Sequence, residues 1–255
     1  MGTNRLNGSL YTAIQNGVAT VEFGHPAGNS FVSELLIRLE TELKALSGKE
    51  DAHLIVLRSE GEGAFCAGAS LDELLAITNA EDGKDFFMGF ARVINAMRNC
   101  PKPIIGRIQG KAVGGGVGLL AACDYVFATE AASVRLSELS IGIAPLVISA
   151  AVERKAGKAG LAELALSPEE WKNAYWAKEK GLYTRVFDKL SELDKELEFF
   201  VQKLASFSPE ALKAIKGVLW EGTQHWESIL SERAALSGKL ALSPQARKAL
   251  EKFRK

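Results

Sequence analysis

Three consecutive glycines, Gly114 to Gly116, stand directly before an Ala- and Leu-rich segment that ends near Ala122. This pattern predicts a tight turn that opens a helix, where the first backbone N–H groups have no acceptor inside the helix. A second stretch of small residues, 64–70, leads into another predicted helix in the same way. Two such N–H groups directed at one carbonyl oxygen would form an oxyanion hole, which stabilises an enolate. Taken alone, each stretch is explained more simply as a tight strand-to-helix turn.

Glu138 is the best candidate for acid–base chemistry. It is the one charged residue in the stretch 136–141. Burial among apolar side chains raises the pKa of a carboxyl group and suits it to proton transfer near neutral pH. Asp72 and Glu73 instead fall in the first turn of a predicted helix, where the helix dipole stabilises a solvated acidic pair. We expect Asp124, at the end of the glycine-led helix, to be structural.

The glycine pattern does not fit two common nucleotide-binding motifs. Leu119 stands where the dinucleotide-binding fingerprint needs its third glycine, and Ala112 stands where a P-loop needs Ser or Thr. The histidines lack metal-ligand spacing, and the cysteines are odd in number with no CxxC pair. These residues are His25, His53, His225, Cys66, Cys100 and Cys123. We therefore expect no metal, no separate cofactor and a reducing, cytoplasmic setting.

The composition is that of an ordinary globular protein. The 255 residues include 31 Lys and Arg and 31 Asp and Glu, so the formal net charge is zero, and 47% of the residues are hydrophobic. A neutral balance argues against bulk electrostatic attraction to nucleic acid or to an acidic membrane. The longest uncharged stretches are too short to span a bilayer. We expect neither nucleic acid nor a membrane as a partner.

Short β-branched runs alternate with helical patterns in the first half of the chain. This alternation predicts an α/β core, because strands separated by helices build a sheet covered by helices. The predicted strands lie at 18–23, 54–57, 104–105 and 125–127, and the predicted helices at 34–46 and 84–98.

The second half of the chain is dominated by helical patterns. Three Ser-Pro pairs, which begin at Ser167, Ser208 and Ser243, predict helix starts with Ser as the N-cap and Pro at the first helical position. From about residue 191 the chain is predicted to form amphipathic helices almost to its end. We therefore divide it into an α/β core, 1–190, and a C-terminal helical region, 191–255.

Together, and in this order, the two small-residue loops resemble the signature loops of the crotonase superfamily, the enoyl-CoA hydratase/isomerase family. The resemblance implies an α/β fold made of a spiral of ββα units with a C-terminal helical extension that serves trimerisation and the substrate pocket. It also implies an acyl-CoA thioester substrate, with coenzyme A as part of the substrate, and a homotrimer or hexamer. The matching segments are 65–73 and 110–124, followed by 21–26, 136–145, 177–182 and 208–213.

The resemblance assigns roles to individual positions. The two backbone amides that polarise the thioester carbonyl in the family fall on Ala69 and Gly115, and a catalytic glutamate falls on Glu138. The resemblance also implies contacts between the protein and the CoA moiety. It further implies that the contacts from the terminal helix come from a neighbouring subunit. The residues implied for CoA binding are His25, Ala27, Ala67, Gly68, Leu71, Gly114, Lys252 and Phe253.

Two positions depart from the family pattern. Typical hydratases of the family carry a second glutamate where this chain has Gly118, which has no side chain for acid–base work. Many relatives place a CoA-contacting Lys where this chain has Asp72, so other basic residues must supply that contact. The width of the acyl pocket depends on which side chains of 74–90 and 145–148 face inward.

Four functions remain open from the sequence. Hydration of a 2-enoyl-CoA, including branched substrates such as methylglutaconyl-CoA, comes first because hydration is the commonest activity of the family. Isomerisation of a 3-enoyl-CoA to a 2-enoyl-CoA comes second, because it needs only one base and Glu138 suffices. A decarboxylase or dehydratase of a polyketide or acyl-carrier pathway is a weaker third. A non-catalytic acyl-CoA-binding protein is a further alternative, favoured by the absence of the second glutamate.

Overall fold

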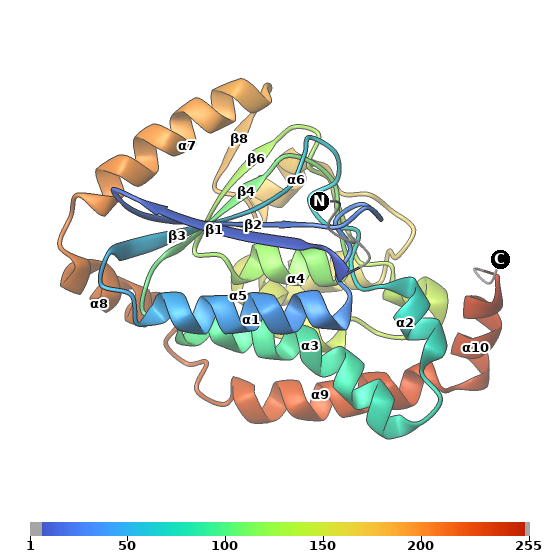
Figure 1. Cartoon of the computed structure of the whole chain (residues 1–255). Coiled ribbons are helices and arrows are strands. Elements are labelled where there is room, and N and C mark those ends of the chain that lie inside the picture. The colour runs from blue at the N-terminus through green and yellow to red at the C-terminus, as the bar shows by residue number, and fades with distance from the viewer. Residues whose placement is uncertain (1–6, 253–255) are drawn as a thin grey trace, which may run out of the picture.

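A six-stranded sheet forms the centre of the computed structural model, which describes residues 7–252 (Figure 1). Its order is β1-β2-β3-β4-β6-β8; β1 pairs antiparallel with β2, and every other pair is parallel. The four predicted strands are confirmed as β2, β3, β4 and β6, whereas β1 and β8 were not predicted. The strands are β1 (Ser9–Gln15), β2 (Gly17–Gly24), β3 (Ala52–Ser59), β4 (Ile104–Ile108), β6 (Tyr125–Thr129) and β8 (Arg185–Phe187).

A second, smaller ladder runs beside this sheet. It consists of β5 (Ala112–Val113) and β7 (Val134–Arg135), and single bridges extend it to Cys66 on one side and to Lys172 on the other. Each successive pass of the chain thus gives one strand to the large sheet and one short segment to the small ladder, and then enters a helix. This repetition confirms the predicted spiral of ββα units. It also brings the loops that leave the small ladder to one end of the molecule.

Helices cover both faces of the large sheet. The predicted helices at 34–46 and 84–98 are confirmed as α1 (Ser33–Ser47) and α3 (Ala80–Asn99), which lie on one face together with α4 (Gly115–Ala122) and α5 (Leu146–Ala165). The opposite face is covered by α7 (Leu190–Ala205). Because both faces are covered, the side chains of the inner strand β4 are all buried.

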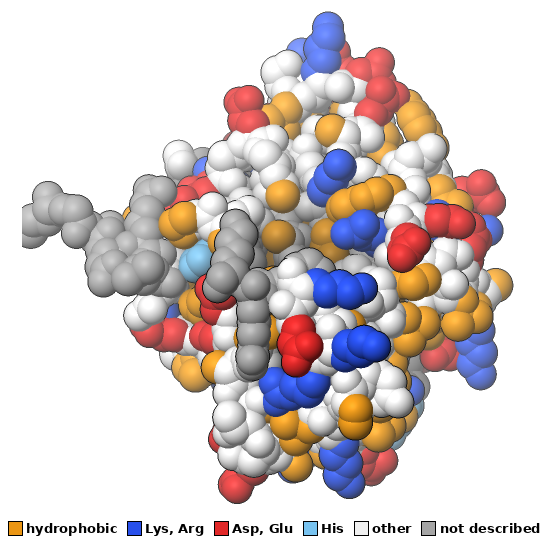
Figure 2. All heavy atoms as spheres, turned by 90° about the vertical axis from the view of Figure 1, so that its right-hand side faces the viewer, with side chains coloured by type: hydrophobic (Ala, Val, Ile, Leu, Met, Phe, Trp, Pro, Cys, Tyr) orange, Lys and Arg blue, Asp and Glu red, His pale blue; other side chains and the backbone are white. Residues whose placement is uncertain are grey.

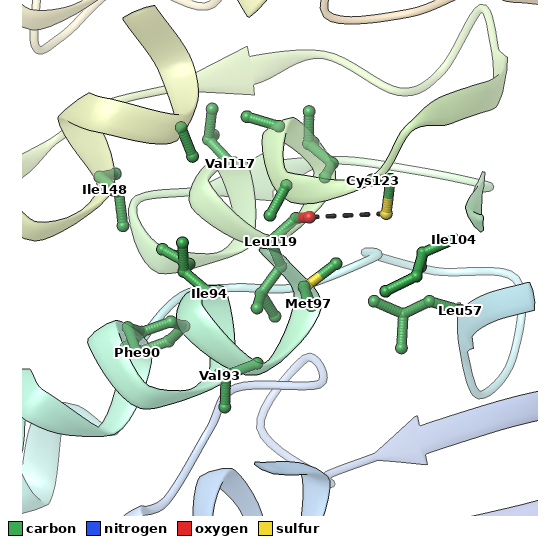
Figure 3. Packing of buried hydrophobic residues seen from close by; sticks show 14 of the residues in the cluster. Leu57, Phe90, Val93, Ile94, Met97, Ile104, Val117, Leu119, Cys123 and Ile148 are labelled. Carbon is green, nitrogen blue, oxygen red and sulfur yellow. Dashed lines mark hydrogen bonds between the residues drawn. The ribbon is translucent and has the colours of Figure 1, made fainter. Parts of the chain in front are cut away.

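The helix α4 is embedded in the core. Seven of its eight residues are buried, and Figure 3 shows it packed between α3, which supplies Phe90 and Met97, and α5, which supplies Ile148. At its end the Cys123 thiol donates to the Leu119 carbonyl, and burial raises the pKa of that thiol to about 12. A helix held on all sides fixes the direction of the amides at its N-terminus.

The end of α4 is anchored by a buried charge. The Asp124 carboxylate accepts hydrogen bonds from Lys216 Nζ and Trp220 Nε1, both at 2.6 Å, and from the Ile104 amide at 2.7 Å. Lys216 and Trp220 belong to the segment 209–220, so the network ties the core to the C-terminal helices. The structural role expected for Asp124 is confirmed.

The C-terminal helices begin where two of the three Ser-Pro pairs predict. Ser208 and Ser243 accept hydrogen bonds from the amides three residues later. The third predicted start, at Ser167, is wrong: α5 has just ended, and Ser167 to Glu170 form one turn before Lys172 pairs with Val134. The remaining helices are α2 (Leu71–Ala76), α6 (Ala174–Glu179), α8 (Pro209–Leu219), α9 (Trp226–Ala241) and α10 (Pro244–Glu251).

Helix α9 lies along α3 and leads to α10 on the side of the molecule that carries α2 (Figure 1). The two helices approach so closely that a Cβ atom on Gly238 would lie 2.6 Å from the Gly83 carbonyl carbon. Helix α10 then packs against η2, a short 3-10 helix at Glu138–Ile141, and Arg247 donates to the carbonyl of Ile77. These contacts close the structure around the loops described next.

The surface near α2 and α10 carries mixed charges. On the face drawn in Figure 2, basic, acidic and hydrophobic side chains are interspersed.

Within residues 7–252, no helix is long and apolar enough to cross a membrane. The same part of the chain contains no group of three or more His, Cys, Asp or Glu placed to hold a metal ion.

Candidate active site

A cavity of about 450 Å³ lies where the loops of the small ladder meet η2, α3, α5 and α9. This is the size of a typical small-molecule site. Its wall is mainly apolar and includes inward-facing side chains from both segments that were expected to shape an acyl pocket. These are Leu74, Phe86, Phe87 and Phe90 from the first segment and Pro145, Leu146, Val147 and Ile148 from the second.

Two free backbone amides line this cavity. The bridge between Phe31 and Ala69 uses the Gly68 carbonyl and the Ser70 amide, at 2.8 and 2.7 Å, and so leaves the Ala69 N–H unused. Gly115 is the first residue of α4, so its N–H has no acceptor inside the helix. Across residues 7–252, neither amide donates a hydrogen bond. Both are therefore available to a ligand oxygen.

The two loops that carry these amides are joined by backbone contacts. The Phe65 amide donates to the Lys111 carbonyl, and the Val113 amide donates to the Cys66 carbonyl, both at 2.9 Å. A Cβ atom on Gly68 would lie 3.2 Å from the Val113 carbonyl oxygen and 4.0 Å from the Gly115 nitrogen. The loops are thus close enough for the two amides to act on one atom.

The glycine run is required by its surroundings. Gly114 has a φ of +52°, and a Cβ atom there would lie 2.9 Å from Glu138 Oε1. At Gly115 a Cβ atom would lie 2.3 Å from Phe90 Cζ. A side chain at either position would displace the carboxylate of Glu138 or the ring of Phe90, and the small residues keep both in place.

Glu138 begins η2 and borders the cavity beside Gly114. Its side chain as a whole is half-buried, but its Oε2 atom is buried and has no hydrogen-bond partner among the described residues. Burial raises the pKa of this carboxyl to about 7, partly offset by a hydrogen bond from its own backbone amide. A carboxyl with this pKa can both accept and release a proton at neutral pH.

The wall at Gly118 is closed by Ile148. A Cβ atom on Gly118 would lie 2.4 Å from Ile148 Cγ2 and 2.7 Å from its Cβ, and both residues lie on helices that pack together in Figure 3. A carboxylate side chain at position 118 would have no room. Glu138 is therefore the only carboxylate among the described residues that line the cavity.

The structure places most of the predicted site residues around this cavity. Glu138, Ala69 and Gly115 line it, as do Ala67, Gly68, Leu71 and Gly114. His25, Ala27 and Lys252 do not line it, and Phe253 lies outside the described residues.

The turn that contains His25 and Ala27 contacts the small-residue loop 64–70, which carries Ala69. The Gly28 carbonyl accepts a hydrogen bond from the Ala67 amide at 3.0 Å. Within the turn, His25 Nδ1 accepts from the Ala27 amide at 3.2 Å. The turn supports the loop from outside the cavity, while Lys252 is exposed just beyond α10.

One of the two acidic residues that follow the small-residue loop 64–70 differs from its predicted setting. Asp72 is exposed, as expected. Glu73 is not a free first-turn acid: its carboxylate accepts hydrogen bonds from the Ser33 amide at 2.9 Å and from the Ser33 hydroxyl at 2.6 Å. It thus joins the first turn of α2 to the first residue of α1.

Two polar residues of the cavity that sequence reasoning did not single out carry a buried polar atom without a hydrogen-bond partner among the described residues. They are Arg135, through its Nε atom, and Ser237, through its Oγ atom. Together with Glu138 they account for three of the five such side-chain atoms in the described part of the chain. A signal for Arg135 was present, since it is the one basic residue in the apolar stretch before Ser137, but nothing marked Ser237.

Comparison with known proteins places these features in context. A family model described as enoyl-CoA hydratase/isomerase matches residues 13–253. Delta(3,5)-Delta(2,4)-dienoyl-CoA isomerase, peroxisomal, of Arabidopsis thaliana is 30% identical over 203 residues, which cover 75% of this chain and 72% of that protein. Methylglutaconyl-CoA hydratase, mitochondrial, of Homo sapiens is 35% identical over 130 residues, which cover 51% of this chain and 38% of that protein.

The fold itself is shared with solved structures. The crystal structure of an enoyl-CoA hydratase from Bacillus halodurans matches with a TM-score of 0.86 at 22% identity, over 95% of this chain and 99% of that chain. The names of the two relatives describe different reactions, an isomerisation and a hydration. The two reactions make different demands on the residues of the cavity.

Proposed function

This chain belongs to the enoyl-CoA hydratase/isomerase family, the crotonase superfamily, and from that premise we propose that it isomerises 3-enoyl-CoA esters to 2-enoyl-CoA esters. The observation that carries the proposal is the single carboxylate of the cavity. Glu138 is the only acid that lines it within residues 7–252, and the wall at Gly118 is closed by Ile148. Moving a double bond needs one base that takes a proton at one carbon and returns it at another.

The free amides of Ala69 and Gly115 support thioester binding in this cavity. In the proposal both donate to the thioester oxygen of the substrate. They hold the negative charge that develops on that oxygen when a proton leaves C2. Ala67, Gly68 and Gly114 allow the backbone to approach the substrate closely, and Leu71 borders the same opening.

Glu138 then carries the proton. As a carboxylate it removes a proton from C2 of the 3-enoyl ester, and the electron pair moves into a dienolate whose oxygen faces the two amides. The protonated Glu138 returns the proton to C4, the double bond settles between C2 and C3, and the carboxylate is restored. Atoms and charge balance without a metal, a separate cofactor or a bound water.

Hydration of a 2-enoyl ester is the second candidate. It is supported by Ser137 and Ser140, which flank Glu138 and also line the cavity, because a water beside the carboxylate would have polar partners there. The human relative named a methylglutaconyl-CoA hydratase points to the same reaction and to branched substrates. We place it second because Ile148, an apolar side chain, closes the wall at Gly118.

We further propose a homotrimer or hexamer, with 1–190 as the α/β core and 191–255 as the region that completes the pocket and forms contacts between subunits. Ser237 of α9 lines the cavity, which supports the first role. Ile215, Val218 and Leu219 are exposed on α8, which supports the second. A cytoplasmic location is supported by the cysteines, which are all free and buried.

Product analysis tests the proposed reaction. The protein is incubated separately with 3-hexenoyl-CoA and 2-hexenoyl-CoA in H₂¹⁸O, and the esters are followed by mass spectrometry and ultraviolet absorbance. We expect the 3-enoyl ester to become the conjugated 2-enoyl ester with no change in mass. A gain of one ¹⁸O-labelled water on the 2-enoyl ester would establish hydration instead. No change in either ester, together with measurable CoA-ester binding, would indicate a non-catalytic binding protein.

A further inference from the structure

Arg135 is the one cationic residue among the described residues that line the cavity. It belongs to β7, and residues 134–137, which include this strand and the two residues after it, alternate in their surroundings. Val134 and Leu136 are buried in the core, whereas Arg135 and Ser137 line the cavity. This is the alternation of an extended strand, in which successive side chains point to opposite sides. The sequence thus directs Arg135 to the substrate side.

Among the described residues, no carboxylate forms an ion pair with Arg135. No carboxylate among the residues described lies within 4.0 Å of its guanidinium, and its Nε atom is buried without an acceptor. The guanidinium carbon lies 4.6 Å from the centre of the Trp171 ring, and Lys111 Nζ lies 4.8 Å from the same ring. A cation–π contact offsets part of the desolvation of a guanidinium but leaves its N–H donors unused.

The proposed isomerisation assigns no substrate atom to the N–H donors of Arg135. The thioester oxygen is met by backbone amides, and the proton is carried by Glu138. A plain hydrocarbon acyl chain offers no acceptor to a buried N–H group, and burial of an unpaired polar group is destabilising. Arginine side chains bind carboxylates through two parallel N–H···O bonds, and such bonds are strong in an apolar environment.

We propose that the acyl group accepted by this cavity carries a second carboxylate at its far end, and that Arg135 binds it. The inference rests on the proposed acyl-CoA function of the site and adds the class of acyl group. Arg135 is then a specificity-determining residue, which does not take part in proton transfer. Ser237 of α9 also lines this cavity, and its hydroxyl is buried without a hydrogen-bond partner among the described residues. This hydroxyl is a second donor for an oxygen of the acyl group.

Binding measurements on non-reactive esters test the proposal without relying on turnover. Glutaryl-CoA and hexanoyl-CoA are saturated esters of similar length that differ at the far end, a carboxylate against an ethyl group. Isothermal titration calorimetry gives Kd for each ester and for CoA alone, with wild type and with Arg135→Gln. Lys111→Gln is the matched control, because it removes an exposed cation over the same Trp171 ring and lies outside the cavity lining.

We expect wild type to bind glutaryl-CoA more tightly than hexanoyl-CoA. Arg135→Gln should weaken glutaryl-CoA binding by about 10- to 100-fold and change the other two ligands by less than about threefold. Arg135→Lys should restore part of the loss, and Lys111→Gln should leave all three ligands within about threefold.

Two results would overturn the proposal, and they are distinguishable. Equal weakening of both esters and of CoA in Arg135→Gln would place the residue on the CoA moiety or in the fold. Equal binding of the two esters by wild type, with no effect of the substitution, would mean that the cavity takes plain acyl chains. If wild type bound neither ester nor CoA, the proposed acyl-CoA function would fail as well.

Discussion

Glu138→Gln lowers kcat for a 3-enoyl-CoA ester by about 10²–10⁴-fold in our account, with little change in the affinity for a saturated CoA ester. The size follows from the loss of one positioned acid–base group. Gln keeps the shape of the side chain and cannot take up a proton from C2. Steady-state kinetics and calorimetric binding of hexanoyl-CoA, measured at pH 8, separate the two effects. Retention of more than a tenth of wild-type turnover would exclude Glu138 as the base.

The pH dependence follows from the same carboxyl group. Burial raises its pKa to about 7, and only the ionised form can accept the proton of C2. We therefore expect kcat/KM of wild type to rise with pH and to level off above about pH 7, with the activity lost as Glu138 is protonated below it. A profile with its midpoint near pH 4.5, the ordinary range of a Glu, would show that the carboxyl is solvated in the free enzyme.

The stability of Glu138→Gln provides the folding control. Glu138 ionises near pH 4.5 in the unfolded chain and near pH 7 in the folded chain. The free energy of unfolding therefore falls as the pH rises between these two values, and the full loss is present above pH 7. We expect the variant to be more stable than wild type by about 1–3 kcal/mol at pH 8, with the gain vanishing near pH 4.5. Chemical denaturation at the two pH values measures this difference, and a less stable variant at pH 8 would contradict the burial of the charge.

Gly115→Pro is expected to have the second large effect, measured against Gly115→Ala. Gly115 is the first residue of α4, a position where Pro fits a helix, and Pro removes the N–H that we assign to the oxyanion hole. Both substitutions add a Cβ atom that would lie 2.3 Å from Phe90 Cζ, so they share the crowding. The Pro variant alone loses the donor. We expect its kcat/KM to fall about 10²–10³-fold below that of the Ala variant.

Both substitutions at Gly115 crowd the ring of Phe90, so the comparison is repeated in a variant that lacks this ring. The same pair of substitutions is made with Phe90→Leu, which removes the ring atoms that a Cβ atom would meet. Far-ultraviolet circular dichroism and thermal unfolding confirm that each variant is folded before its kinetics are compared. If the Pro and Ala variants turned over the 3-enoyl ester at equal rates in both backgrounds, the Gly115 amide would have no role in stabilising the enolate.

Much of the fold could be predicted from local patterns, and the misses have physical causes. The buried strands β3 and β4 and the helices α1 and α3 have strong apolar runs. By contrast, β1 carries mostly exposed or half-buried side chains and is fixed by its pairing with β2, which no local pattern records. Ser167 has a good N-cap sequence, yet the pairing of Lys172 with Val134 pulls the following chain into an extended path.

The candidate site also has a part that local sequence patterns could predict and a part that they could not. The small-residue loops and Glu138 could be found because backbone approach and a lone acid in an apolar stretch are local features. Ile148 faces Gly118, and Ser237 faces the cavity, only because α5 and α9 fold back against α4 and α3. These contacts join residues far apart in the sequence, and they change the expected chemistry: the closed wall at Gly118 moves isomerisation ahead of hydration, the activity favoured by the sequence alone.

The most direct test of the central claim, that one carboxylate moves the proton, is deuterium transfer within the substrate. A 3-enoyl-CoA ester labelled with deuterium at C2 is isomerised in ordinary water, and the product is examined by NMR after the first turnovers. We predict that part of the deuterium removed from C2 appears at C4, because the protonated Glu138 returns it before exchange is complete. A product whose new C4 hydrogen comes entirely from solvent, or one that has gained a water, would contradict transfer by this single buried group.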